Sequence, residues 1–521
     1  MSVALNILFL VVFSNVFIVN DAARILAVFP IPSVSHQVVF RPLTQELVQR
    51  GHEVIVVTPD PAFPKGRTPN NLTEIDIHDI SYEMWQQFIM LAGDQKTEYE
   101  KMISAMILIQ KIFEVQIQTR EIQDLLRDSS QKFDLLLVEA CVPYALAFSH
   151  VYKNIPVIQI SSFAGFSDNY KTFGATTHPL LYPDIFRNRI HNLSFLDKMN
   201  ELYIHYSFEM MYDSIKTDAN VLLKKLFGQD TPSVTELYNN VDLLLLNVHS
   251  IWDSNRPVPP NIIYLGGMHQ KPQKNLTAEL QNYLDSSKKG VIYVSFGSNF
   301  RPSLFPPEKV QAMVNVFSKL PYDVLWKWDK DVLPGQTKNI KISKWLPQSD
   351  LLRHPKIKMF ITQCGLQSTD ESITAGVPLI GIPIMGDQFY NSEKYVALEI
   401  GLKIQLDTLT EEQLKTAIDT IANNKSFKEN IVKLRSVMYD QPQTPLQRAV
   451  WWTEHALRHR GVRHLRSSAH NISWVEYFEI YLVLPLLLAT IVCLAVMAYI
   501  AFVVLRHLIV MVLVNEKQKS S

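Results

Sequence analysis

Residues 360–388 carry polar side chains at spacings that suit the binding of an anion. The segment is predicted to form a strand, a tight turn at Cys364 and Gly365, and a helix whose first turn contains Gln367 and Ser368. The first amide groups of a helix have no acceptor within the helix, and the helix dipole places positive charge at the same end. The pattern therefore predicts an anion-binding site at the start of this helix.

Two carboxylates and an indole accompany this segment. Glu371 and Asp387 are suited to accept hydrogen bonds from the hydroxyl groups of a ribose or another sugar, and Trp345 offers a flat aromatic face to a base. Each residue also has a simpler interpretation. Gln367 and Ser368 could cap or solvate the helix, and Trp345 could be buried for packing alone. The combination of these residues favours the binding site.

His36 is a candidate general base. It is predicted to lie in the loop after an apolar strand at residues 25–29, at an edge where parallel sheets place catalytic residues. An imidazole with a pKa of about 6.5 can take a proton from a hydroxyl group at neutral pH when a carboxylate orients the ring. A solvated surface histidine is the alternative, because a single histidine in a loop is a weak signal.

Strands and helices must alternate around these residues to bring them together. Strand, helix and strand are predicted in turn at residues 25–29, 38–49 and 54–58, and further strands at residues 135–138 and 157–161. Residues 82–127 form a helical insertion with methionine and aromatic residues. The insertion would either wall an apolar pocket or pack as an ordinary amphipathic helix on the core.

A proline-rich stretch at residues 256–260 interrupts this pattern and is predicted to connect two domains. The alternation then resumes, with strands predicted at residues 291–296, 324–327, 359–362 and 378–383 and helices at residues 308–320, 368–375 and 391–400. The predicted fold class is therefore α/β, with two doubly wound Rossmann-like domains that face each other across a cleft. Ligand-binding loops would lie at the carboxyl ends of the strands.

Apolar segments occur near both ends of the sequence. Residues 1–23 are predicted to be a signal peptide, although its start lacks lysine and arginine. Residues 480–505 contain no charged residue and are long enough to cross a hydrocarbon core of about 30 Å, which predicts one transmembrane helix. The apolar run at residues 508–514 is too short to cross, so it either lies at the interface or continues the helix.

These segments predict a membrane topology. A signal peptide commits the body of the chain to the lumen, and the tail at residues 506–521 would then face the cytosol. Lys517 and Lys519 in this tail have the form of a retrieval signal of the endoplasmic reticulum. Acceptor sites for N-glycosylation in a lumenal body occur at Asn71, Asn192, Asn275, Asn424 and Asn471. We therefore expect a single-pass type I glycoprotein of the endoplasmic reticulum membrane with lumenal catalytic domains.

The composition argues against several other classes of protein. The chain has 50 lysine and arginine residues and 50 aspartate and glutamate residues, so no net charge points to a nucleic-acid partner. It has three cysteines, one of them within the apolar span, which leaves no disulfide framework and no spacing typical of zinc ligands. No GxGxxG motif follows the first strand, which counts against a nicotinamide-dependent enzyme.

Residues 360–388, together with Trp345 and Gln348, resemble the signature of the UDP-glycosyltransferase family of UDP-glucuronosyltransferases and UDP-glucosyltransferases. The likeness extends from His36 to the C-terminal apolar span and is greatest to membrane-bound insect members. It implies the GT-B architecture, with an acceptor-binding domain at residues 24–255 and a UDP-sugar-binding domain at residues 256–445. Residues 446–479 would form helices that lead to the membrane. The resemblance also implies a UDP-sugar co-substrate and no cofactor.

The resemblance implies roles for individual residues of the donor site. Trp345 is expected to stack on uracil beside Gln348, and Glu371 to bind the ribose hydroxyls. Asp387 and Gln388 are expected to bind the hydroxyls of the transferred sugar. The residues expected around the diphosphate are Ser298, Gln363, Gly365, Gln367 and Ser368. Position 363 is often histidine in the family, so glutamine here would make a neutral contact.

The resemblance also implies a catalytic pair. Family members use a histidine at the position of His36 as general base, and in most of them an aspartate orients it. The corresponding position after the strand at residues 135–138 is Glu139 here, which is one methylene longer. Asp134 precedes the same strand and is instead expected to cap it. His36 and Glu139 are therefore the expected catalytic residues.

The implied reaction is a direct displacement at the anomeric carbon, with inversion and without a metal ion. Asp329 and Asp331 form a DxD pair of the kind that metal-dependent glycosyltransferases use, but their polar surroundings favour a solvated turn. The likeness to insect members favours glucose over glucuronate as the sugar, since no basic partner for a glucuronate carboxylate can be placed. The acceptor is expected to be a small lipophilic molecule such as a plant phenolic, a steroid or a pigment.

Two other functions stay open at the level of sequence. A lipophile-binding membrane protein without catalysis could retain the nucleotide-binding fold, and glutamate at position 139 is the main argument for it. A phosphorylase of similar architecture would need a pyridoxal cofactor and fits a secretory topology poorly. The family resemblance is also compatible with a homo-oligomer.

Overall fold

The computed structural model describes residues 22–91 and 98–519. The predicted signal peptide at residues 1–23 lies outside the described residues except for Ala22 and Ala23, so it stays a prediction. The chain divides into two compact units, one ending at Ser467 and the other beginning at Ser468. Each unit is described by itself.

The first unit opens with a seven-stranded parallel sheet of order β3-β2-β1-β4-β5-β6-β7. Its strands are β1 (Arg24–Val28), β2 (Glu53–Thr58), β3 (Leu72–Asp76), β4 (Leu135–Glu139), β5 (Val157–Ser161), β6 (Val241–Leu246) and β7 (Ile262–Tyr264). Strands β4, β5 and β6 are buried along their whole length. Such continuous apolar strands are typical of a parallel sheet that is covered by helices on both faces.

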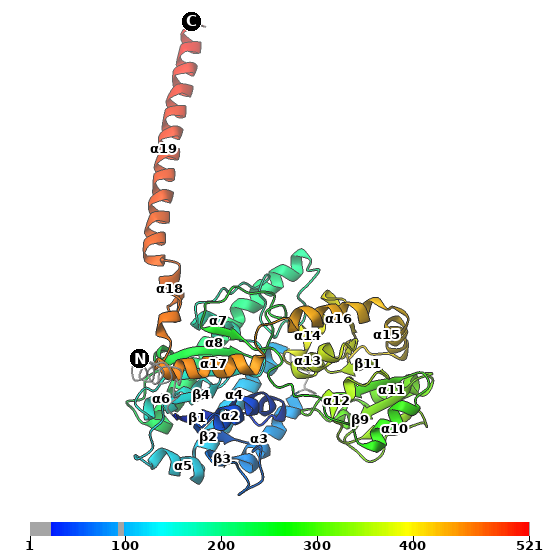
Figure 1. The fold of residues 1–521 in the computed structure, drawn as a ribbon. Helices are drawn as coiled ribbons and strands as arrows, with labels where there is room; N and C mark the ends of the chain where they lie inside the picture. Colours follow the sequence, from blue (N-terminus) through cyan, green and yellow to red (C-terminus); the bar gives the residue numbers. More distant parts are fainter. Residues whose placement is uncertain (1–21, 92–97, 520–521) are drawn as a thin grey trace, which may run out of the picture. The chain divides into compact units, whose positions relative to one another are not determined.

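Helices surround this first sheet, which occupies the blue to green part of Figure 1. They are α2 (Val34–Gln49), α3 (His78–Leu91), α4 (Glu98–Ile117), α5 (Arg120–Arg127), α6 (Ala147–Val151), α7 (Ser167–Thr172), α8 (Phe195–Phe227) and α9 (Val234–Leu237), with 3-10 turns η1 (Pro143–Leu146) and η2 (Tyr238–Asn240). The predicted helical insertion at residues 82–127 corresponds to most of α3 and to α4 and α5. The strands β3, β6 and β7 and the long helix α8 were not predicted from the sequence.

The start of α2 corrects one sequence prediction. The helix was predicted from residue 38, with His36 in the preceding loop, but it begins at Val34. The carbonyl of Ser33 accepts hydrogen bonds from the backbone N–H groups of His36 and Gln37, at 2.9 and 3.2 Å. These bonds close a helical turn as soon as the chain has passed Pro32, so His36 lies in the first turn of the helix.

The second sheet has six parallel strands in the order β10-β9-β8-β11-β12-β13. Its strands are β8 (Val291–Ser295), β9 (Asp323–Lys327), β10 (Ile340–Ser343), β11 (Ile357–Thr362), β12 (Leu379–Gly381) and β13 (Gly401–Lys403). The accompanying helices are α10 (Ala278–Ser286), α11 (Pro307–Ser318), α12 (Gln348–Leu352), α13 (Leu366–Ala375), α14 (Gln388–Ala397), α15 (Glu411–Asn423) and α16 (Ser426–Tyr439), with the 3-10 turn η3 (Pro302–Leu304). The chain therefore contains two doubly wound α/β domains, as predicted.

Two segments connect the domains in sequence and in space. The strand β7 follows the proline-rich stretch at residues 256–260 yet pairs with β6 in the first sheet. The helix α17 (Pro445–Arg458) returns from the second domain, followed by the 3-10 turn η4 (Arg463–Leu465). Apolar residues of α17 share a buried cluster with α2, and Arg50 pairs with Glu454 at 3.2 Å. The predicted domain limits at residues 255 and 445 stay predictions.

The C-terminal unit contains the short helix α18 (Trp474–Tyr477) and the helix α19 (Ile480–Lys519). Of the helices in the described part of the chain, α19 is the one long and apolar enough to cross a membrane, with a mean hydropathy of 2.8 over its most apolar stretch. The helix runs without interruption through residues 508–514, which decides between the two alternatives for this run. The proposed transmembrane segment therefore continues as a helix into the predicted cytosolic tail.

Candidate active site

A strained turn joins β11 to α13. Cys364 has a φ of 72°, in the left-handed region that residues with a side chain rarely adopt, and Gly365 occupies the N-cap of α13. The backbone N–H of Thr369 is bonded to the carbonyl of Gly365 at 3.0 Å, which begins the helical ladder. The preceding amides of the first turn have no acceptor within the helix, and their predicted role in binding an anion stays a prediction.

A polar pocket lies at the carboxyl ends of the second sheet and encloses about 1300 Å³ of empty space, part of it open to solvent. The residues predicted from the sequence that line it are His36, Ser298, Trp345, Gln348, Gln363, Gly365, Gln367, Ser368, Glu371, Asp387 and Gln388. Glu139 is the one predicted site residue that does not line this pocket. Tertiary structure thus gathers side chains from both domains around a single space.

Gln348 organises one end of the polar pocket. Its amide nitrogen donates to Glu371 at 2.7 Å and to Ser368 at 2.9 Å, and its amide oxygen accepts from the hydroxyl of Tyr293 at 3.0 Å. Burial raises the pKa of Glu371 to about 7, although the hydrogen bond from Gln348 opposes this shift. The indole of Trp345 in the same pocket is 67% exposed. A flat ring and a carboxylate are therefore both available to one ligand.

The loop after β8 lies against Gln363. Gly297 has a φ of 77°, and a Cβ atom there would lie 2.0 Å from the amide nitrogen of Gln363. The positive φ favours glycine at this position, and any side chain here would require the Gln363 amide to shift. Gln367 takes a different direction, since its amide donates to the carbonyl of Ser162 at 2.9 Å. One N–H of Gln367 is therefore engaged with the first domain rather than with the pocket.

Asp387 lies at the start of α14, where it lines the polar pocket. Its carboxylate accepts a hydrogen bond of 2.8 Å from the amide of Asn391, one helical turn further on. Burial raises the pKa of Asp387 to about 6, while Asn391 and the charge of His36 lower it. The neighbouring Gln388 accepts from the backbone N–H groups of Ile384 and Met385 at 2.9 and 3.1 Å. Its amide oxygen is thus committed to the loop.

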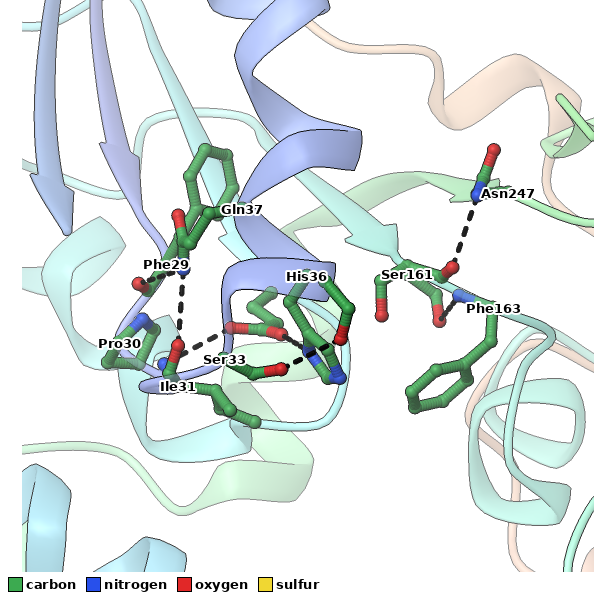
Figure 2. A network of polar contacts seen from close by, with 12 residues as sticks. Phe29, Pro30, Ile31, Ser33, His36, Gln37, Ser161, Phe163 and Asn247 are labelled. Carbon is green, nitrogen blue, oxygen red and sulfur yellow. Dashed lines mark hydrogen bonds and ion pairs between the residues drawn. The ribbon is translucent and has the colours of Figure 1, made fainter. Parts of the chain in front are cut away.

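His36 and Glu139 form a largely buried hydrogen-bonded pair. The Nδ1 atom of His36 lies 2.5 Å from a carboxylate oxygen of Glu139, and Glu139 is only 1% exposed. The second carboxylate oxygen accepts from the backbone N–H of Ile31 at 3.4 Å. Figure 2 shows the imidazole beside Ser33 and facing Phe163, whose ring meets it edge-on at 5.4 Å between centroids. The Nε2 edge is therefore the one left to accept a proton.

A second, apolar pocket is also lined by the imidazole of His36. It encloses about 960 Å³, and α4, α3 and the loops after β1, β4 and β5 supply most of its walls. The apolar side chains that line it are Ile31, Trp85, Met102, Ala105, Met106, Ile109, Phe163, Phe166, Phe186, Phe300 and Met385. His36, Asn299, Asp387 and Gln388 line both pockets. The helical insertion therefore does wall an apolar pocket.

Comparison with known proteins connects this geometry with a family. Residues 24–519 match the family described as UDP-glucoronosyl and UDP-glucosyl transferase. The chain belongs to this family. It is 36% identical to an ecdysteroid UDP-glucosyltransferase of Spodoptera littoralis nuclear polyhedrosis virus, over 93% of this chain and 98% of that protein. It is 31% identical to UDP-glucosyltransferase 2 of Dactylopius coccus, over 96% of this chain and 97% of that protein.

Solved structures share the fold of this UDP-glycosyltransferase. An anthocyanidin 3-O-glucosyltransferase in complex with UDP superposes with a TM-score of 0.58 at 17% identity, over 84% of this chain and 99% of that one. The calicheamicin glycosyltransferase CalG4 gives a TM-score of 0.56 at 16% identity, with the same coverage. The architecture is GT-B, as the resemblance implied. The protein is an enzyme that transfers a sugar from a UDP-sugar donor. This excludes the alternative of a lipophile-binding membrane protein without catalysis.

Three residues of this UDP-glycosyltransferase site were missed at the level of sequence. Lys327 lines the polar pocket at the end of β9, and the position of a residue at the carboxyl end of a predicted strand was a usable signal. Asn391 holds Asp387 from the next turn of the same helix. Asn299 bonds to Ser33 across the two domains at 3.0 Å. No local pattern in the sequence marked this last contact.

The other carboxylates considered in the sequence, Asp134, Asp329 and Asp331, do not line either pocket. Asp134 accepts a hydrogen bond of 2.8 Å from the backbone N–H of Arg24, the first residue of β1, so it caps the neighbouring strand and not β4, which it precedes. Asp329 bonds to Ser303, whereas Asp331 pairs with Lys344 at 2.7 Å. The two carboxylates of the DxD pair are therefore engaged with different partners.

Proposed function

We propose that this enzyme transfers glucose from UDP-glucose to a hydroxyl group of a small lipophilic acceptor, with inversion and without a metal ion. The observation that best supports this proposal is the position of His36, which lines both pockets and is bonded to Glu139. A hydroxyl group in the apolar pocket would meet a sugar held in the polar pocket at this imidazole. Nε2 of His36 would take the proton as the acceptor oxygen attacks the anomeric carbon.

In this proposal UDP lies along the polar pocket. Trp345 stacks on uracil beside Gln348, and Glu371 accepts hydrogen bonds from the ribose. The diphosphate is surrounded by Ser298, Gln363, Gly365, Gln367 and Ser368, and Asp387 and Gln388 face the sugar. The amides at the start of α13 stabilise the charge that develops on the leaving group. This role for the protein dipoles and the engaged carboxylates of Asp329 and Asp331 support a reaction without a metal ion.

The walls of the apolar pocket support a hydroxylated, largely apolar acceptor. Methionine and phenylalanine side chains dominate the lining and adapt to flat or polycyclic molecules. The names of the viral relatives, ecdysteroid UDP-glucosyltransferases, support steroids as the first class to examine. Plant phenolics are the second class, since they present a hydroxyl on a flat apolar body.

We further propose that α19 anchors the enzyme in the endoplasmic reticulum membrane, with the catalytic domains in the lumen. The length and apolar character of α19 support the anchor. Four of the acceptor sites for N-glycosylation have exposed asparagines and are accessible to glycosylation in the lumen: Asn71, Asn192, Asn275 and Asn424. Removal of high-mannose glycans by endoglycosidase H should increase the electrophoretic mobility of the full-length protein. A protein without glycans in insect cells would contradict the lumenal orientation.

The function is tested with membranes that contain the full-length protein. They are incubated with UDP-glucose or UDP-glucuronate and a panel of hydroxylated steroids and phenolics, and UDP release and product mass are measured. We expect glucosides, with UDP-glucose preferred over UDP-glucuronate. The coupling constant of the anomeric proton should report the β configuration, and excess EDTA should leave the rate unchanged. An α-configured product, or a rate that EDTA abolishes and magnesium restores, would refute the proposed mechanism.

A further inference from the structure

Lys327 is a cation at the wall of the polar pocket, where two loops meet. It is the last residue of β9, which lies between β8 and β10 in the second sheet. Its Nζ atom donates to the carbonyl of Gly297, in the loop after β8, at 2.8 Å. The same atom lies 4.5 Å from the centre of the ring of Trp345, which follows β10. The ammonium group therefore stands between the aromatic ring and the loop that carries Ser298.

This ammonium group has neutral partners in the structure. It contacts a carbonyl and an aromatic face, and burial lowers its pKa without an opposing carboxylate in the described part of the chain. Partial removal of a cation from water costs free energy that a nearby anion would offset. The exposed Lys344, by contrast, pairs with the carboxylate of Asp331 at 2.7 Å. The position of Lys327 is therefore suited to an anionic ligand.

The charges of the other side chains that line the polar pocket support this inference. Among the described residues of the lining, Lys327 is the one lysine or arginine, while Asp350, Glu371 and Asp387 are carboxylic acids. His269 is neutral, because burial lowers its pKa to about 4. Gln363 is neutral as well. A diphosphate bound here would find a single lysine or arginine side chain.

We propose that Lys327 is the residue that pairs with the diphosphate of UDP. The inference rests on the proposed location of UDP in the polar pocket, with uracil on Trp345 and the diphosphate near Ser298. Lys327 contacts Trp345 directly and also contacts Gly297, the residue before Ser298. It therefore lies at the junction of the proposed sites for the nucleoside and the diphosphate. Hydrogen bonds between ammonium and phosphate are charge-assisted and stronger than those that a glutamine donates.

A glucuronate carboxylate is the other anion that a lysine in a donor pocket could recognise. The residues proposed to face the sugar, Asp387 and Gln388, belong to α14 and line the apolar pocket as well. Lys327 does not line that pocket; it contacts the ring proposed to hold the base. The geometry therefore favours the diphosphate over the sugar.

The experiment compares the binding of uridine, UDP and UDP-glucuronate to the purified full-length enzyme in detergent, by isothermal titration calorimetry. Lys327→Met keeps the length and apolar stem of the side chain but removes its charge, and Lys327→Arg keeps the charge. Lys330→Met, at an exposed position three residues further on, is the matched control. Glu371→Gln tests the proposed location of UDP independently, since it should weaken uridine and UDP alike.

We expect Lys327→Met to weaken UDP binding by about tenfold or more, with less than about a twofold effect on uridine. Lys327→Arg should retain most of the affinity, and Lys330→Met all of it. The dissociation constant of UDP should rise with added NaCl for the wild type and rise less for Lys327→Met. Retained uridine binding shows that the variant is folded.

Four results would overturn the inference. Equal weakening of uridine and UDP by Lys327→Met would mean that the lysine only packs on Trp345. An unchanged affinity for UDP, combined with a loss for UDP-glucuronate, would assign the lysine to the sugar. If Glu371→Gln weakened uridine and UDP while Lys327→Met changed neither, UDP would still bind in this pocket but without Lys327. If no variant had any effect, the location of UDP itself would be wrong.

Discussion

Asn391 holds the carboxylate of Asp387 with a hydrogen bond of 2.8 Å. The same amide nitrogen donates to the carbonyl of Cys364 at 2.9 Å, and its oxygen accepts from the indole N–H of Trp252 at 2.8 Å. Asn391 is only 2% exposed, so the orientation of its amide is determined by these partners. The carboxylate that we propose to bind the sugar is thereby connected to a residue of the first domain.

Replacement of Asn391 by leucine should move the acid limb of the pH profile to higher pH. Burial raises the pKa of Asp387 to about 6, and Asn391 is one of the groups that oppose this rise. Without the amide the pKa increases further, so the ionised carboxylate that accepts from sugar hydroxyls is lost at a higher pH as the solution is acidified. The measurement is kcat/KM for UDP-glucose between pH 5 and pH 8.

Trp252→Phe is the matched control for this prediction. It removes the indole donor to Asn391 but leaves the bond between Asn391 and Asp387 in place. A smaller shift of the acid limb is therefore expected. An identical profile for the wild type and Asn391→Leu would show that Asn391 does not act through Asp387.

Loss of the catalytic pair should reduce turnover without weakening UDP. His36→Ala is expected to lower kcat by about 10²-fold to 10⁴-fold, the usual contribution of a general base. Glu139→Gln keeps the size of the side chain but removes the charge that orients Nδ1, and we expect an intermediate loss. Steady-state kinetics with a saturating acceptor measures kcat, and calorimetry measures UDP affinity. Near wild-type turnover in His36→Ala would exclude it as the base.

Uridine binding should weaken as the pH falls from 8 to 6. Burial raises the pKa of Glu371 to about 7, and the ionised form is the better acceptor for ribose hydroxyls. Affinity is therefore present above this pKa and declines below it, by up to about tenfold per pH unit. Uridine is the appropriate ligand because it lacks a phosphate that titrates in this range. Glu371→Gln should bind weakly with little pH dependence; a pH dependence equal to that of the wild type would point to another group.

Asp370→Asn should stabilise the protein most at alkaline pH. Burial and the charge of Glu371 raise the pKa of Asp370 to about 8, and one of its oxygens has no hydrogen-bond partner among the described residues. In the unfolded chain this carboxyl ionises near a pKa of about 3.9. The folded state thus holds a proton that the unfolded state has released, and stability falls as the pH rises from about 4 to about 8.

Thermal unfolding followed by intrinsic fluorescence tests this prediction. The gain in Tm of Asp370→Asn over the wild type should increase between pH 5 and pH 8. Asp331→Asn, at an exposed position, should change Tm equally little at both values. A pH-independent difference for Asp370→Asn would mean that its carboxyl does not titrate in this window.

The sequence by itself predicted the segments of the donor site correctly. The strand, turn and helix at residues 357–375 are present with Gly365 at the N-cap, and the strands that end near Ser298 and Glu139 lie where the apolar runs placed them. These features depend on neighbouring residues, since periodicity, glycine and capping act within a few positions of each other. The rule that parallel strands present ligands at their carboxyl ends then brought most site residues to one edge.

Tertiary structure alone decided which side chains meet. The pairing of His36 with Glu139, 103 positions away, was expected only from the family resemblance. No sequence pattern indicated that Gln367 turns to the carbonyl of Ser162, or that Lys327 stands between Gly297 and Trp345 without a carboxylate of the described chain beside it. Such contacts depend on how helices and sheets pack, which local patterns do not specify. The raised pKa values of Glu371 and Asp387 have the same origin, because they follow from removal of water by residues distant in the chain.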